Sequence, residues 1–392
     1  MKKLLIFVDW FVPGFKAGGQ IRSCFNLAMA LKEAAEVYVV TSDRDMGDQE
    51  AYQSVKIDEW TVLDNDIRVL YLSAKKRGYK SMESIIKSVA PECIYLNSMF
   101  SFNFTLLPIE VCSRLTGAKP KIVLAPRGML HQGALQYKKL KKNIFFRAFK
   151  IRGFHRQVVF HATNPEEHAD VFKVFGKRAR VHFCPDFPAT MNQSIEIIPK
   201  HPGLLKCVFV ARIAANKNLL FFLSVLKAVK TDVTLSVVGP VEDEAYWAAC
   251  CALIKALPEN ITVKHLGTIP NEELVHVYRQ HHLLVLTSQG ESYGHVIFEA
   301  LSNGRPVLIS DKTPWKNLKE KNIGWELPLN GENAFVDAVT TACGWNQETF
   351  DRYCYSSFNF ASTSSDTSVL KKQYMELFQK ENHAAKGRLK HI

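Results

Sequence analysis

The sequence predicts an α/β protein with two doubly wound domains that face each other across a cleft. Three observations support this. Short apolar runs alternate with amphipathic helical stretches in both halves of the chain. A segment with four prolines and little periodicity, residues 184–203, separates the halves. The 392 residues are enough for two domains of ordinary size.

The first half contains seven apolar runs that we expect to be strands. They are residues 3–9, 37–41, 68–72, 93–97, 121–125, 158–162 and 180–183. Helical patterns cover residues 22–34, 81–90, 106–115, 135–152 and 165–175. This alternation predicts a parallel sheet whose strands are joined by covering helices.

The second half repeats this arrangement after the proline-rich segment. Expected strands are residues 206–211, 234–239, 261–266, 283–286 and 305–309, and expected helices are 219–229, 242–256, 271–281 and 294–303. We therefore expect an N-terminal domain at 1–188, a linker at 189–204, a second domain at 205–350 and C-terminal helices at 351–392, which include an amphipathic stretch at 368–381. Ligands of such sheets bind beyond the carboxyl ends of the strands.

The amino-acid composition indicates which kinds of binding partner to expect. A formal charge of +12 and a pI near 9.2 favour nucleotide phosphates, nucleic acid or an anionic membrane surface. Nucleic acid ranks lowest because no nucleic-acid motif is present. No apolar run approaches the roughly 20 residues of a membrane span. The nine cysteines show no CxxC spacing, which indicates reduced thiols in a cytoplasmic protein.

The most informative stretch is residues 283–309, an apolar run followed by a small-residue break and a helical pattern. Glu291 lies in the break, and Glu299 lies about two helical turns further along. A helix N-terminus attracts phosphate or sugar oxygens, and carboxylates accept hydrogen bonds from hydroxyl groups. The simpler alternative is a pair of solvated glutamates that complement the helix dipole.

These residues resemble the signature of the retaining GT-B glycosyltransferases of family 4, also called glycosyl transferases group 1. The pattern Glu291-x7-Glu299 stands within TSxxESYGxxxxEALSNGRPVL, with Ser-Tyr-Gly where the family usually has Gly-Phe-Gly. Arg212 and Lys217 stand in FVARIAANKN, which is similar to the family's GRLxxxKN segment, with Ala211 in place of glycine. The resemblance implies the GT-B architecture, in which two Rossmann-like domains face across a cleft and the last helices cross back to the first domain.

The resemblance also implies roles for individual residues. Arg212 and Lys217 would hold the donor diphosphate, whereas a lone surface arginine or lysine is usually only a solvated charge. The remaining donor-binding residues would be Glu291 at the sugar hydroxyls, Tyr293 and Gly294 at sugar and phosphate, Glu299 at the ribose, and Gly267 to Ile269 at the base. No metal cofactor is expected, because cations and the helix dipole would stabilise the leaving group. The alternative activity is a GT-B sugar-nucleotide epimerase.

A glycine-rich segment precedes the first predicted helix. Gly14, Gly18 and Gly19 allow backbone N–H groups to approach an anion or a sugar, although their spacing is not GxGxxG. A plain turn between strand and helix explains the same pattern. The family has a glycine-rich loop here, which assigns Gly18 and Gly19 to donor binding.

Two candidates for the acceptor side follow the strand at 121–125. The run Pro126–Leu130 resembles a subset of the family from bacterial surface-polysaccharide pathways. Many other members have a histidine directly after this strand, whereas this chain has Pro126 and Arg127, and the next histidine is His131. Arg127 and His131 are therefore acceptor-side candidates. A polysaccharide or lipid-linked glycan is the expected acceptor.

Residues 135–152 form a basic amphipathic pattern in which phenylalanines and cations interleave. One interpretation is a helix on anionic lipid, which would make the protein peripheral on the inner face of the membrane. The other is an aromatic stripe that faces the core while the basic face is solvated.

Three weaker patterns complete the sequence. Glu166 partly matches a TSxxE pattern that the family often has at this helix start. Asp64-Asn65-Asp66 is a DxD that we interpret as a turn. His281 and His282 have no third ligand at metal-binding spacing.

Overall fold

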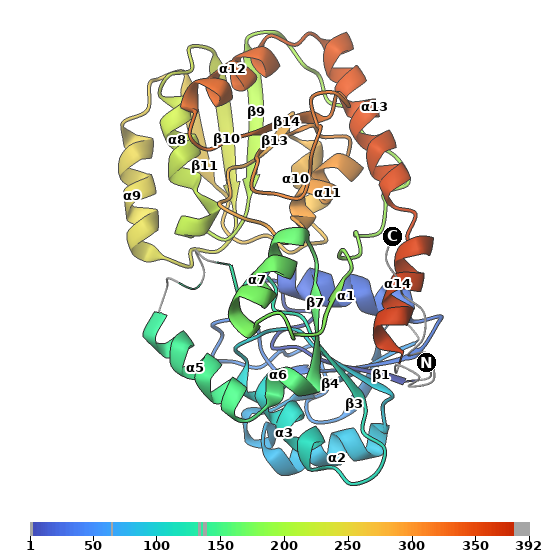
Figure 1. Cartoon of the computed structure of the whole chain (residues 1–392). Helices are drawn as coiled ribbons and strands as arrows, with labels where there is room; N and C mark the ends of the chain where they lie inside the picture. Colours follow the sequence, from blue (N-terminus) through green and yellow to red (C-terminus); the bar gives the residue numbers. More distant parts are fainter. Residues whose placement is uncertain (1–2, 64–65, 132–134, 136–138, 380–392) are drawn as a thin grey trace. The chain divides into compact units, whose positions relative to one another are not determined.

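The structure is a computed structural model that describes residues 3–63, 66–131, 135 and 139–379 (Figure 1). Its described residues divide into two compact units. Among the described residues, the first comprises 3–11, 27–185 and 368–379, and the second comprises 12–26 and 186–367. The segment expected to be a linker, 189–204, therefore belongs to the second unit.

The first unit is built on a sheet with the order β3-β4-β2-β1-β5-β6-β7-β8. Its strands are β1 Lys3–Phe7, β2 Glu36–Ser42, β3 Trp60–Leu63, β4 Ile67–Leu72, β5 Cys93–Leu96, β6 Lys121–Leu124, β7 Val158–Ala162 and β8 Val181–Phe183. All neighbours are parallel except β3 and β4, and Leu5 of β1 pairs with Tyr38 of β2 and Ile94 of β5. The central strands are buried on both faces, which explains their continuous apolar sequence.

Helices cover this first sheet. They are α2 Tyr79–Val89, α3 Leu107–Arg114, α5 Lys139–Ile151, α6 Phe154–Gln157, α7 Pro165–Phe175 and α14 Ser368–Phe378, with a 3₁₀ turn η1 at Ala74–Lys76 and a π turn η2 at Phe102–Leu106. Helix α1, Gly19–Leu31, contributes its first eight residues to the second unit and its last five to the first. The start of α7 is set by Asn164, whose side chain accepts from the Glu167 N–H at 2.7 Å.

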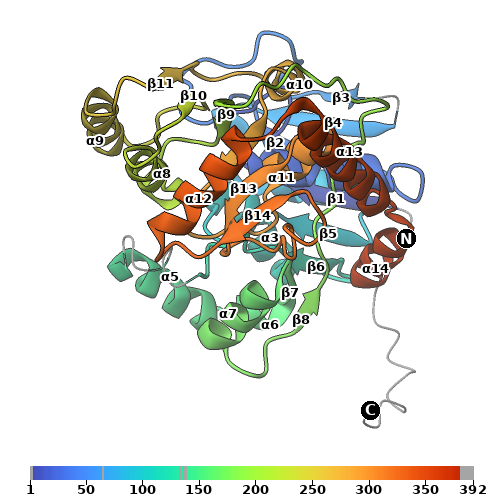
Figure 2. The ribbon, with the colours of Figure 1, turned by 90° about the horizontal axis from the view of Figure 1, so that it is seen from above.

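The second unit is built on a parallel sheet with the order β11-β10-β9-β12-β13-β14. The strands are β9 Leu204–Val210, β10 Asp232–Val238, β11 Ile261–His265, β12 Leu283–Leu286, β13 Val307–Ser310 and β14 Gly324–Leu327. The helices are α8 Leu219–Leu226, α9 Glu244–Lys255, α10 Leu274–Arg279, α11 His295–Ser302, α12 Glu332–Cys343 and α13 Gln347–Ser364, with the 3₁₀ turn η3 at Ala215–Lys217. Helices α8, α9 and α12 lie together on one side of this sheet, whereas α11 and α13 pack together on the other (Figure 2).

The two C-terminal helices belong to different units. Helix α13 packs on α11 in the second unit. Helix α14 lies against the first sheet, where Phe378 contacts the Tyr95 ring and Lys121 Nζ donates to the Gln379 carbonyl at 2.8 Å. The C-terminal segment therefore returns to the unit that holds the start of the chain.

Two features of the described residues bear on the composition. All nine cysteines are free thiols, and eight of them are buried, whereas Cys251 on α9 is partly exposed. No helix among the described residues combines the length and the apolar character needed to cross a bilayer.

Candidate functional site

The strand order of the second sheet reverses between β9 and β12, and the predicted motifs follow these two strands. The loop after β12 is tied to the loop after β9 by the Thr287 hydroxyl, which donates to the Asn218 carbonyl at 2.9 Å. A second bond runs from the Gln289 N–H to the Asn216 carbonyl at 2.8 Å. The structure thus brings the Arg212–Lys217 segment and the Glu291 loop together where open α/β sheets bind ligands.

Lys217 and Glu291 form an ion pair at this point. The distance from Lys217 Nζ to Glu291 Oε1 is 2.6 Å, and the side chains are only 16% and 13% exposed. Arg212 pairs with Glu242 instead, which lies between β10 and α9 and is more exposed. Each predicted diphosphate-binding cation therefore has a carboxylate partner in the same unit.

Glu299 is held on α11 with both carboxylate oxygens engaged. Tyr278 donates its hydroxyl to Oε2 at 3.1 Å, and Arg22 Nε lies 3.3 Å from Oε1. Burial, with the nearby Glu299 charge, raises the pKa of Tyr278 well above its ordinary value, so its hydroxyl keeps the proton it donates. Glu299 is a positioned, nearly buried carboxylate and not a solvated helix residue.

The turn that starts α11 is held in one conformation. Gly294 has φ 79°, a left-handed value that glycine adopts without strain, and it forms the N-terminal cap of α11. Trp315 Nε1 donates to the Tyr293 carbonyl at 2.6 Å. Burial raises the pKa of the Tyr293 phenol. The predicted pair Tyr293–Gly294 thus forms the turn that leads into α11.

The glycine-rich segment lies near the same helix start. Gly18 has φ 62°, and α1 begins at Gly19. A Cβ placed on Gly19 would lie 3.9 Å from His295 Cδ2, the first residue of α11. Gly18 and Gly19 therefore approach the α11 N-terminus within the second unit.

Gly267 and Ile269 follow β11, two strands away from β9. The Gly239 N–H donates to the Gly267 carbonyl at 2.8 Å, and Ile269 packs on the core of the unit. A Cβ on Gly239 would lie 2.0 Å from the Ala211 carbonyl oxygen, so this position requires glycine. The loops that follow β9, β10 and β11 therefore lie next to one another.

The acceptor-side candidates of the first unit lie in different surroundings. Arg127, with φ 57°, directs its side chain inward, where it donates to Asn97 Oδ1 and, at 2.9 Å, to the Tyr95 hydroxyl. His131 is exposed, and its N–H donates to the Gly128 carbonyl at 3.1 Å. Arg127 therefore belongs to a polar network at the strand ends, whereas the His131 side chain is exposed.

The TSxxE assignment to Glu166 was wrong by one position. Glu166 is exposed, whereas Glu167 is buried and accepts from the Gly128 N–H at 2.7 Å and from the Thr163 N–H and hydroxyl at 2.8 Å. Burial nevertheless raises the pKa of Glu167. The glutamate that matters structurally is the one four residues after Thr163, because helix geometry turns the preceding side chain toward solvent.

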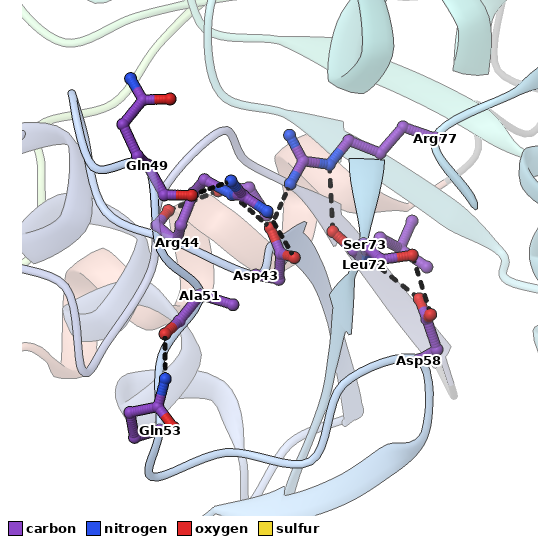
Figure 3. Close-up of polar contacts among 10 residues, drawn as sticks. Asp43, Arg44, Gln49, Ala51, Gln53, Asp58, Leu72, Ser73 and Arg77 are labelled. Atoms are coloured by element: carbon purple, nitrogen blue, oxygen red, sulfur yellow. Dashed lines mark hydrogen bonds and ion pairs between the residues drawn. The ribbon is translucent and has the colours of Figure 1, made fainter. Parts of the chain in front are cut away.

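The strand order of the first sheet reverses between β1 and β5, and a second polar cluster lies there. Ser101 donates its hydroxyl to Asp9 Oδ1 at 2.6 Å. Burial raises the pKa of Asp9, although the Ser101 bond and the charge of Arg77 oppose the shift. In Figure 3, Arg44 and Arg77 reach the neighbouring Asp43 from two sides, with Arg44 Nε at 2.9 Å and Arg77 Nη2 at 2.5 Å from Oδ1.

Comparison with known proteins finds a family model that matches part of the chain. Residues 192–342 match the model of glycosyl transferases group 1. This match covers most of the second unit and less than half of the chain. No protein with a curated description matches it.

Solved structures agree on the fold. HepE from Anabaena, in complex with UDP and glucose, has a TM-score of 0.67 and 15% identity over 96% of this chain and 99% of its own. Sucrose-phosphate synthase from Thermosynechococcus elongatus has a TM-score of 0.68 and 16% identity, and the match covers 96% of this chain and 98% of that one. WaaG, a glycosyltransferase involved in lipopolysaccharide biosynthesis, has a TM-score of 0.65 and 14% identity, and the match covers 96% of this chain and 99% of that one. The predicted GT-B fold is confirmed.

The weaker sequence patterns have structural explanations. His281 bonds the Val277 carbonyl at 2.6 Å and the Ser236 hydroxyl at 2.8 Å, and His282 bonds the Lys206 N–H and the Pro199 carbonyl. Burial lowers the pKa of His282 to about 4. The described residues contain no group of three or more potential metal ligands. Of the DxD pattern, Asp64 and Asn65 fall outside the described residues.

Sequence reasoning missed the partners of the predicted site residues. Arg22 and Tyr278 hold Glu299, Glu242 pairs with Arg212, and His295 meets the glycine-rich segment. Only Arg22 carried a local signal, because it lies three residues after the glycine pair, in the first turn of a predicted helix. The others come from elements whose proximity depends on the strand order.

Proposed function

We propose that this glycosyltransferase moves a sugar from a nucleotide-diphosphate sugar to a hydroxyl group of a polysaccharide or lipid-linked glycan, with retention of the anomeric configuration. The observation that carries the proposal is the 2.6 Å pair of Lys217 and Glu291 at the reversal of the second sheet. Glu299 lies about one turn into the adjacent helix α11, where it can accept bonds from ribose hydroxyls.

Exchange of ion partners explains how this site would accept a donor. A diphosphate carries more negative charge than one carboxylate, so it can replace Glu291 beside Lys217 and Glu242 beside Arg212. Glu291 would then be released to accept hydrogen bonds from sugar hydroxyls.

Departure of the nucleoside diphosphate is the step that the residues would assist. Lys217, Arg212 and the N-terminus of α11 stabilise the charge that develops on the leaving oxygen. The acceptor hydroxyl attacks on the face that the leaving group vacates and gives its proton to the departing diphosphate oxygen, so the configuration is retained. The proposal assigns no carboxylate as a covalent nucleophile and no metal ion to these steps.

The comparisons support the substrate classes. HepE was solved with UDP-glucose, which makes UDP-sugars the first donors to test. The connection of WaaG to lipopolysaccharide supports a glycan or lipid-linked acceptor. The epimerase alternative is not favoured by the family match.

The surface of α5 supports an acceptor held at an anionic membrane. Phe146 and Phe149 face the core and contact Phe175, as one interpretation of the sequence expected. The opposite side is also apolar. Leu140, Ile144 and Ile151 are 74%, 60% and 86% exposed, with the exposed cations Lys141, Arg147 and Lys150 beside them. An exposed aliphatic stripe bordered by cations fits the boundary between lipid headgroups and acyl chains.

Donor and stereochemistry can be tested together. Purified protein is incubated with UDP-, GDP- and ADP-sugars and a lipid-linked glycan acceptor, and the anomeric configuration of the product is determined by NMR. We expect transfer with retention; an inverted product, or an epimerised sugar formed from donor alone, would contradict the proposal.

The membrane contact needs a separate measurement. We expect the protein to sediment with vesicles that contain phosphatidylglycerol and not with phosphatidylcholine vesicles. Ile144→Asp should abolish sedimentation, whereas Thr341→Asp, an exposed change on α12 of the second unit, should not. Equal sedimentation of wild type and Ile144→Asp would remove α5 from the membrane contact.

A further inference from the structure

The first turns of α1 carry polar side chains that are buried within the second unit. Ser23 is 4% exposed, and its hydroxyl contacts two other buried groups, Asp186 and His295, which are 3% and 7% exposed. The Ser23 oxygen lies 3.0 Å from Asp186 Oδ2 and 2.8 Å from His295 Nε2. We call these three residues the clasp.

The direction of the hydrogen bonds in the clasp follows from the number of protons. Ser23 has one hydroxyl proton, which it donates to Asp186 Oδ2. His295 must then donate to the Ser23 oxygen, which places the ring proton on Nε2. The clasp is therefore a one-way chain from His295 through Ser23 to Asp186.

Neighbouring contacts reinforce the clasp. Arg22 pairs with Glu299, which lies four residues after His295 and hence on the same face of α11. Asn26, one turn after Ser23, donates to the Phe187 carbonyl at 3.1 Å. The start of α1 is thus fixed to α11 and to residues 186–187 by buried polar bonds.

This attachment places the glycine-rich segment beside the start of α11. Helix α1 begins at Gly19, four residues before Ser23, and α11 begins at His295 itself. With Ser23 bound to His295, the backbone at Gly18 and Gly19 is held beside the N-terminus of α11. Two helix starts with unpaired N–H groups and positive dipole ends are thereby brought to one place.

We propose that Ser23, His295 and Asp186 are positioning residues for the transfer reaction, which hold the glycine-rich segment where the donor diphosphate binds. The inference rests on the proposed function. Because the segment is already ordered, the donor does not spend binding energy on ordering it. A role in folding alone would stabilise the unit without affecting the donor selectively.

The test uses the full chain with Ser23→Ala, His295→Ala and His295→Gln. We expect the first two variants to raise the donor KM and weaken nucleoside diphosphate binding by about tenfold. The acceptor KM should stay within about twofold. His295→Gln should restore donor binding, because its amide N–H can donate to Ser23. His276→Ala, an exposed histidine on α10, serves as the control.

The outcomes separate this inference from the proposed function. If the wild type binds none of UDP, GDP and ADP in calorimetry, both the proposed function and the role of the clasp are refuted. If the wild type binds one of them and Ser23→Ala binds it equally well, only the clasp is refuted. Failure of His295→Gln to improve on His295→Ala would also refute it. Should His295→Ala not fold, Ser23→Ala and His295→Gln decide, together with ¹⁵N NMR, which must show the His295 proton on Nε2.

Discussion

The two units place different chemistry at the same topological position. In the first unit the strand order reverses between β1 and β5, where Asp9 accepts a hydrogen bond from Ser101 at 2.6 Å. In the second it reverses between β9 and β12, where Glu291 pairs with Lys217 at the same distance. One pair joins a carboxylate to a neutral hydroxyl, and the other joins opposite charges.

This difference indicates how one architecture can hold two kinds of chemical partner. The charged pair can exchange one anion for another, which suits a diphosphate. The Asp9 carboxyl, whose pKa is raised by burial, is better suited to a neutral hydroxyl partner. The chemistry is set by the residues after each strand, and the sheets supply only the position.

Removal of Lys217, the cation at the point where the strand order of the second sheet reverses, should have the largest effect on activity. Lys217→Ala removes a charge that would stabilise the leaving group, so we expect kcat/KM to fall by about a hundredfold or more. Steady-state kinetics on a UDP-sugar measures this. Lys227→Ala, an exposed lysine of the same unit, should leave the rate unchanged. A Lys217→Ala variant with wild-type kinetics would eliminate this reversal as the donor site.

Removing the negative charge of Glu291 should affect nucleotide binding and turnover in different ways. Glu291→Gln loses the ion pair with Lys217, so the diphosphate no longer competes with it. We expect the Kd for nucleoside diphosphate to stay equal or fall, while kcat decreases by about tenfold. Calorimetry and kinetics on the same preparation give both values. Weaker binding together with unchanged kcat would argue against the exchange of partners.

At the first reversal the expected effect is on stability. Because burial raises the pKa of Asp9 above its ordinary 3.8, the folded chain binds this proton more readily than the unfolded chain. The contribution of Asp9 to stability is complete below 3.8 and is lost as the pH rises through the folded pKa. Asp9→Asn should therefore raise the unfolding temperature at about pH 7, with a gain that shrinks toward about pH 4.

Thermal unfolding across this pH range checks the prediction. Asp337→Asn, an exposed change on α12, should show no such trend. A gain for Asp9→Asn that grows as the pH falls would reverse the assigned sign.

The smallest effect is expected at the exposed pair Arg212–Glu242. Their side chains are 30% and 43% exposed, so solvent screens the interaction. Glu242→Gln should change the free energy of unfolding by at most about 0.5 kcal/mol. It should tighten nucleoside diphosphate binding by about twofold, as measured by titration at low salt. A loss of binding would mean that Glu242 itself contacts the donor.

Most strands were predictable because buried parallel strands are continuous apolar runs. The exceptions have physical causes. Strand β3 alternates between exposed and half-buried residues at a sheet edge, and β14 begins at Gly324, where a Cβ would lie 1.8 Å from the Val307 carbonyl oxygen. Helix α12 lies within the expected second domain, where no helix was predicted, and helix α13 crosses the expected boundary at residue 350.

The predicted site was partly accessible from sequence for a similar reason. Lys217 and Glu291 stand in recognisable segments, and strand order brings those segments together. Their partners have no such signal. Tyr278 is buried like a core tyrosine, and Ser23 resembles any polar helix residue until His295 is placed beside it. Predicting these contacts requires the three-dimensional arrangement, because each joins elements that are distant along the chain.

The burial of the cysteines has a practical consequence. Eight thiols are inaccessible, and burial raises the pKa of some of them, to about 11 for Cys250. Cys251, on α9, is the partly exposed one. A maleimide fluorophore should therefore attach at one position of the wild-type chain, giving an optical reporter of nucleotide titrations without any engineered residue.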